Sequence, residues 1–130
     1  MSYYLSKTLS NTSVKSAIDK VRDVLKDEGF GIISEIDVSK TLKEKIDVDY
    51  KEYIILGACN PHFAYRAIQS EEKTGLFLPC NIIVVDAGDG NTEVSVIDPI
   101  ASMSPVKNDD LREFAESVRT SLFSAINKLT

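Results

Sequence analysis

Apolar residues recur at helical spacing in two long stretches, one near each end of the chain. The first stretch follows Ser13, a favourable N-cap, and ends at Gly29, a residue typical of the position just past a helix. The second follows Asn108 and has acidic residues in its first turn, where the helix dipole favours them. The apolar positions are Val14, Ala17, Ile18, Val21, Val24 and Leu25 in the first, and Leu111, Phe114, Ala115, Val118, Leu122, Ala125, Ile126 and Leu129 in the second. Each set lies along one face of a helix, so the pattern predicts two long amphipathic helices.

Shorter segments around these helices have the patterns of strands. Phe30, Ile32, Ile36 and Val38 share one parity, which predicts a half-buried strand. The expected strands are residues 2–9, 30–38, 53–58, 78–85 and 92–98, with a hairpin turn at 87–91. The segments 53–58 and 78–85 are apolar on both faces, except at Asn81 in the second. Short helices are expected at 39–46 and from Pro61 to before Gly75, and a loop at 99–107.

The order of these elements predicts the fold class. A strand and a long helix come first, then four strands with two short helical insertions, and then the second long helix. Because hairpin-type connections join the later strands, an antiparallel sheet of about five strands with both long helices on one face is expected. The chain is therefore predicted to be an α+β protein with a single domain at residues 1–130.

Composition limits the classes of partner. The chain has 15 Lys and Arg against 20 Asp and Glu, a net charge of -5. This balance argues against nucleic-acid binding and against a polybasic membrane patch. No signal-peptide pattern and no apolar run of ~20 residues is present, which predicts a cytoplasmic protein with free thiols at Cys59 and Cys80. The single histidine, His62, excludes multi-histidine metal sites, and no cofactor is expected.

The segment from Gly57 to His62 is the most informative place for chemistry. Asn60 is a strong N-cap and Pro61 is favoured at the first helical position, so a strand runs directly into a helix. Free backbone amides there form a potential anion site, and a helix N-terminus can lower the pKa of Cys59. The alternative is structural, since most such turns are good caps and most such cysteines are small buried residues.

Cys80 adds a second thiol at the start of a strand. If strands 53–58 and 78–85 are antiparallel neighbours, Cys59 and Cys80 lie near each other, with His62 close by. These three side chains could supply metal ligands, and the two thiols could form a redox pair. Neither a metal-type spacing nor a Cys-x-x-Cys motif is present.

Several motifs in this order resemble the family called domain of unknown function 302. They are Glu28-Gly29-Phe30-Gly31, Ile36-Asp37-Val38 with Thr41-Leu42-Lys43, Gly57-Ala58-Cys59-Asn60-Pro61, Leu78-Pro79-Cys80-Asn81, and the ending from Asp89-Gly90 through Val94 to Asp98-Pro99. The resemblance implies a TATA-box-binding-protein-like α+β fold and a homodimer. It implies no established activity and no proven role for a residue.

Three hypotheses on function follow. The first is a non-catalytic cytosolic homodimer that binds a small ligand or a partner protein, because no complete catalytic set is present and a sheet with a long helix can enclose a pocket. The second is a thiol-redox or metal-binding protein that uses Cys59 and Cys80, with His62 assisting. The third is anion binding at the helix start formed by Asn60, Pro61 and His62. The residues proposed for a ligand or thiol site are thus Cys59, Asn60, His62 and Cys80, with no catalytic role assigned.

Overall fold

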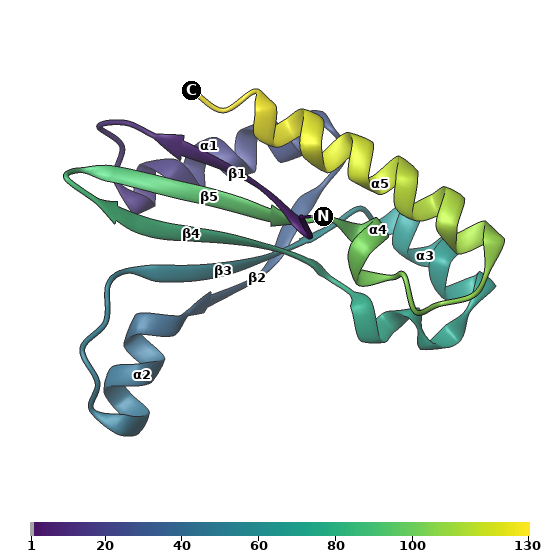
Figure 1. Ribbon diagram of the computed structural model, residues 1–130, viewed down its shortest axis with the longest axis horizontal. Helices are drawn as coiled ribbons and strands as arrows, with labels where there is room; N and C mark the ends of the chain where they lie inside the picture. Colours follow the sequence, from purple (N-terminus) through teal and green to yellow (C-terminus); the bar gives the residue numbers. More distant parts are fainter. Residues whose placement is uncertain (1) are drawn as a thin grey trace.

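Five strands form one antiparallel sheet in the computed structural model, which describes residues 2–130 (Figure 1). The order of strands across the sheet is β1-β5-β4-β3-β2, so the N-terminal strand pairs with the last one. The strands are β1 (Tyr4–Leu9), β2 (Gly31–Asp37), β3 (Tyr53–Cys59), β4 (Cys80–Gly88) and β5 (Asn91–Ile97). The predicted α+β class with a five-stranded antiparallel sheet is confirmed.

Helices occupy most of the remaining chain. They are α1 (Val14–Asp27), α2 (Val38–Ile46), α3 (Pro61–Ser70), the 3-10 helix η1 (Glu72–Phe77), α4 (Pro99–Ser102) and α5 (Asp109–Asn127). The prediction of a loop throughout 99–107 is wrong at its start. There the carboxylate of Asp98 accepts a hydrogen bond from the amide of Ile100 at 2.9 Å, and this cap begins α4. The single helix expected after Pro61 is divided at Glu71, whose backbone is extended.

The ends of α1 follow the sequence signals. Ser13 Oγ accepts a hydrogen bond from the amide of Ser16 at 3.1 Å, which satisfies one of the free donors of the first turn. Gly29 has a φ of +81°, and the amide of Phe30 donates to the carbonyl of Leu25 at 2.9 Å. This arrangement closes the helix and turns the chain into β2.

The core lies between one face of the sheet and the helices α1 and α5, which both cover that face (Figure 1). This face is called the inner face here. Its side chains from the three central strands are almost fully buried against the apolar faces of the two helices. The central residues of this core are Leu56, Ile82, Val84, Val94 and Val96 of the sheet, Val21 and Leu25 of α1, and Leu122 and Ile126 of α5.

Strand β2 departs from the expected half-buried pattern. Ile32 pairs with Ala58 and Ile36 pairs with Ile55, which lie on opposite faces of β3. The register shifts between Ile32 and Ser34, so a bulge moves the following residues to the other face. Ile36 is therefore 50% exposed, instead of sharing the buried face of Ile32.

Within residues 2–130, no helix is both long enough and apolar enough to cross a bilayer.

Candidate functional site

The two thiols lie at the ends of adjacent strands. Ala58 of β3 pairs with Cys80 of β4, so Cys59 is one residue from the partner of Cys80. Both cysteines line the same cavity beside the core, and its volume is about 20 Å³. That space holds about one water molecule and is too small for a substrate.

Cys80 is buried in apolar surroundings, with 7% of its surface exposed. Burial, with a smaller contribution from the neighbouring Cys59, raises the pKa of the Cys80 thiol to about 11. The thiolate is the nucleophile and the metal ligand, so Cys80 remains in its unreactive form at neutral pH. Both cysteines are free thiols.

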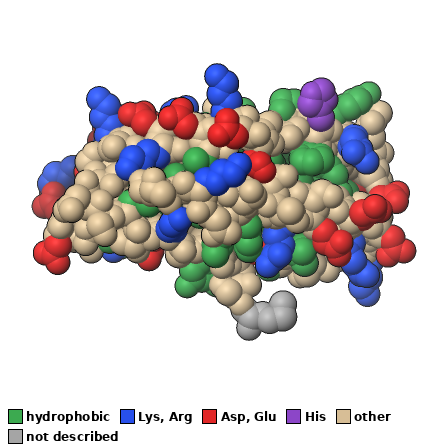
Figure 2. Space-filling view, turned by 90° about the horizontal axis from the view of Figure 1, so that it is seen from above, with side chains coloured by type: hydrophobic (Ala, Val, Ile, Leu, Met, Phe, Trp, Pro, Cys, Tyr) green, Lys and Arg blue, Asp and Glu red, His purple; other side chains and the backbone are tan. Residues whose placement is uncertain are grey.

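Asn60 and His62 lie beside the thiols in sequence, but only Asn60 lines the same cavity. Asn60 Oδ1 accepts hydrogen bonds from the amides of His62 at 3.1 Å and Phe63 at 3.3 Å. The cap thus engages two of the amides that the anion hypothesis requires. The side chain of His62 is exposed, as the purple side chain in Figure 2 illustrates.

Metal ligation requires several donors to converge on one point. Among residues 2–130, His, Cys, Asp and Glu side chains do not form a group of three or more that could hold a metal ion. The arrangement of Cys59, Cys80 and His62 therefore does not favour the metal alternative.

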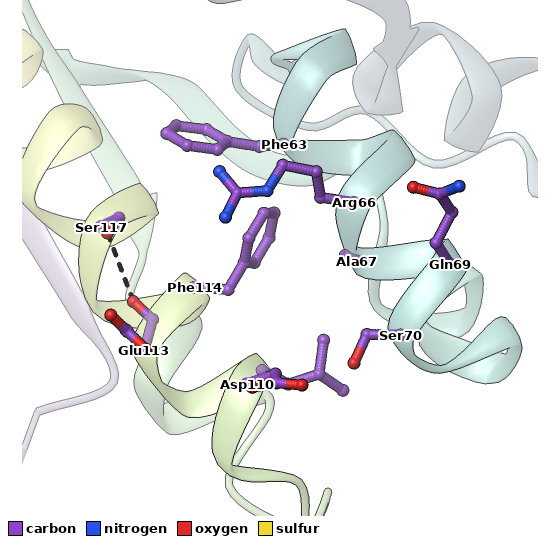
Figure 3. Close-up of a pocket in the computed structure, with 10 residues that line it drawn as sticks. Phe63, Arg66, Ala67, Gln69, Ser70, Asp110, Glu113, Phe114 and Ser117 are labelled. Carbon is purple, nitrogen blue, oxygen red and sulfur yellow. Dashed lines mark hydrogen bonds between the residues drawn. The ribbon is translucent and has the colours of Figure 1, made fainter.

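A larger depression lies between α3 and α5, where the two helices diverge (Figure 3). It is called the α3–α5 groove here, and its volume is about 560 Å³. Its floor contains Phe63 and Phe114, whose rings meet edge to face with centroids 5.3 Å apart. Its walls carry Arg66, Gln69 and Ser70 from α3, and Asp110, Glu113 and Ser117 from α5.

The second face of the sheet is not covered by α1 or α5 and is called the open face here (Figure 1). Cross-strand partners share a face, so the register defines its residues. They are Tyr4, Ser6 and Thr8 of β1, Glu93, Ser95 and Ile97 of β5, Asn81, Ile83 and Val85 of β4, Tyr53, Ile55, Gly57 and Cys59 of β3, and Gly31, Ser34 and Ile36 of β2. Glu93 is the charged residue in this set, although charged residues make up 27% of the chain.

The residues of the α3–α5 groove were not singled out as a site from the sequence. Phe114 appears there as part of an apolar helix face, and Asp110 as an acidic residue in a first turn. A possible signal was Arg66, a basic residue on a helix that also carries Phe63. The meeting of α3 with α5 depends on long-range packing, which the spacing of residues does not reveal.

The architecture defines an α+β protein in which a five-stranded antiparallel sheet has two long helices on one face and an uncovered second face. The family named domain of unknown function DUF302 has a model that matches residues 5–129, and the chain belongs to this family. The chain is also similar to a crystal structure of an uncharacterized conserved DUF302 protein from Bacillus stearothermophilus. The two share 25% identity and a TM-score of 0.91, with 100% of each chain covered. The comparison with curated proteins gives no match.

Proposed function

We propose that this DUF302 protein is a non-catalytic binding protein that acts as a homodimer, with the two subunits paired through their open faces. The observation that carries the proposal is the scarcity of charge on that face. Interface centres are depleted of charged residues, whereas ordinary solvated surfaces are rich in them. By contrast, Lys, Arg, Asp and Glu side chains are interspersed over the helix-covered side of the molecule (Figure 2).

The strand pattern supports the same conclusion. Strands β3 and β4 have apolar residues on both faces, a pattern typical of strands that are buried on both sides. Within one chain, α1 and α5 cover only the inner face. The outward-pointing Ile55 and Ile83 remain partly exposed. A second copy on the open face would cover them.

The chain exposes more surface than a compact monomer of its mass. The chain exposes 7891 Å², whereas a compact monomer of this mass exposes about 6,800 Å². The excess is roughly 1,000 Å², and each partner in a standard interface buries about 800 Å².

One pair of polar groups on the open face is already satisfied within the chain. The hydroxyls of Ser6 and Ser95 hydrogen-bond to each other across β1 and β5. An isologous pair about a two-fold axis would place the same face of each subunit in contact.

The non-catalytic part of the proposal rests on the state of the thiols. The raised pKa of Cys80 keeps that thiol protonated, and its cavity has no room for a substrate. His62 is exposed and does not line that cavity. A binding role, for a small ligand or for a partner protein, needs none of these residues to react.

Light scattering coupled to gel filtration tests the dimer. The wild-type protein should have about twice the chain mass of 14.4 kDa. Ile36→Glu introduces a charge at a 50% exposed position of the open face and should give a monomer. The matched control is Ile68→Glu, at a 44% exposed position of α3, which should remain a dimer. A wild-type protein that has the monomer mass at every concentration would overturn the proposal.

A further inference from the structure

The α3–α5 groove carries opposite charges on its two walls. Arg66 extends from α3 over the floor of the groove, and Asp110 and Glu113 extend from α5 (Figure 3). Among residues 2–130, the ion pairs of the structure involve other side chains, and none joins Arg66, Asp110 or Glu113. These three charges are therefore available to a bound molecule.

The floor of the groove is apolar and firmly held. Phe63 packs against Phe30 of the main core as well as against Phe114, with ring centroids 6.4 and 5.3 Å apart. Ala67 and Leu111 lie beneath this floor and are almost fully buried, so the rings of Phe63 and Phe114 are the apolar surface that a ligand meets. An aromatic or aliphatic body of a ligand can contact this floor without a rearrangement of the core.

The N-terminus of α5 does not itself supply an anion site to the groove. Asn108 Oδ1 accepts hydrogen bonds from the amides of Asp110 at 3.0 Å and Leu111 at 3.4 Å. The acidic side chains of this turn also repel an anion on that wall. An anionic group is therefore favoured on the wall of α3, and a cationic group on the wall of α5.

We propose that the α3–α5 groove binds a small zwitterion with an apolar body, of which a free aromatic amino acid is the simplest example. Arg66 donates hydrogen bonds to the carboxylate, and the amide of Gln69 lies on the same wall. Asp110 and Glu113 accept hydrogen bonds from the ammonium group. The apolar body lies on the rings of Phe63 and Phe114. The volume of about 560 Å³ is within the range of small-molecule sites, which is about 300–1,000 Å³.

This inference rests on the proposed binding function but not on the dimer, because the open face and the groove use different residues. A nitrogen-15 NMR titration distinguishes the two. The probes are L-phenylalanine, phenethylamine and 3-phenylpropionate, which share one apolar body and carry both charges, only the cation, or only the anion. L-phenylalanine should give saturable shifts confined to the amides of α3 and α5, whatever the mass of the protein. Each single-charge probe should bind about tenfold or more weakly, since each loses a charge-assisted contact.

Matched variants test the two walls. Arg66→Gln should weaken the binding of L-phenylalanine about tenfold, while Arg112→Gln, the same change on α5 outside the groove, should not. Asp110→Asn should weaken it as well, while its neighbour Asp109→Asn should not. The inference is overturned if no probe gives saturable shifts up to its solubility limit, or if 3-phenylpropionate binds as tightly as L-phenylalanine. A monomeric protein that still binds L-phenylalanine would overturn only the proposed dimer.

Discussion

The two faces of the sheet differ in how far the helices of the same chain bury them. On the inner face, the central side chains are buried by α1 and α5, and charged residues occur at its margins. There Lys7 donates to the carbonyl of Asn127 at 2.9 Å, and Glu35 pairs with Arg22 at 3.1 Å. On the open face, neither α1 nor α5 covers the centre, and yet charge is nearly absent. The difference indicates that coverage within one chain explains the composition of only one of the two faces.

The largest expected effect is on the inner face. Leu56 is fully buried there, so Leu56→Ala should lower the free energy of unfolding by about 2–5 kcal/mol through lost burial and a cavity. Ile36→Ala on the open face, at a 50% exposed position, should cost about 1 kcal/mol or less in the monomer. Urea denaturation of both variants at one protein concentration measures the difference. Equal losses would contradict the distinction between the faces.

The thiols provide a second comparison, between the buried Cys80 and the partly exposed Cys59. A pKa of about 11, against an ordinary 9.0, leaves Cys80 about a hundredfold less thiolate near pH 8. Mass spectrometry after timed alkylation with iodoacetamide should therefore find Cys59 labelled first. Labelling of Cys80 at the same rate would show that its surroundings open readily.

The same shift predicts a pH dependence of stability. The pKa of Cys80 is higher in the folded state than in the unfolded state. Its contribution to the free energy of unfolding is therefore fully present below about pH 9 and is lost as the pH rises toward about 11. Cys80→Ala should remove this decrease in the free energy of unfolding between about pH 9 and about pH 11, whereas Cys59→Ala should leave the decrease in place. Denaturation curves across this pH range make the comparison.

A smaller loss of stability is expected at Gly57, where Ser34 and Pro79 lie against the open face. A Cβ atom at Gly57 would overlap the hydroxyl of Ser34 and lie 2.6 Å from Cγ of Pro79. Gly57→Ala should therefore lower the free energy of unfolding by about 1–3 kcal/mol. Gly31→Ala in β2 is the control, because within residues 2–130 a Cβ added there has no atom within 4 Å apart from those of Gly31 and its two chain neighbours. Thermal or urea denaturation that finds the two variants equally stable would show that β3 shifts to relieve the contact.

Much of the fold was predictable because local patterns determined it. Ser13 and Gly29 bound α1, and Asn108 begins α5, since caps act within one turn of the chain. The faces of β2 were not predictable in this way. A bulge adds one residue without a change in composition, so Ile36 passed to the opposite face from Ile32.

The candidate sites divide similarly. The proximity of Cys59 and Cys80 followed from the antiparallel arrangement of their strands, but their small cavity did not. The α3–α5 groove joins Arg66 to Asp110, residues that are far apart in the sequence. No spacing rule connects such positions, because their approach depends on how two helices pack on a shared core.

The sequence by itself determined most of the elements, the α+β class and the family, because periodicity, caps and motifs are local properties. Its pattern also indicated that β3 and β4 have apolar residues on both faces. Only the tertiary structure decided which side α1 and α5 cover, where the sheet remains open and which charges face each other across α3 and α5. These features depend on contacts between segments that are distant in the sequence. Such contacts form only when side chains pack in the folded chain.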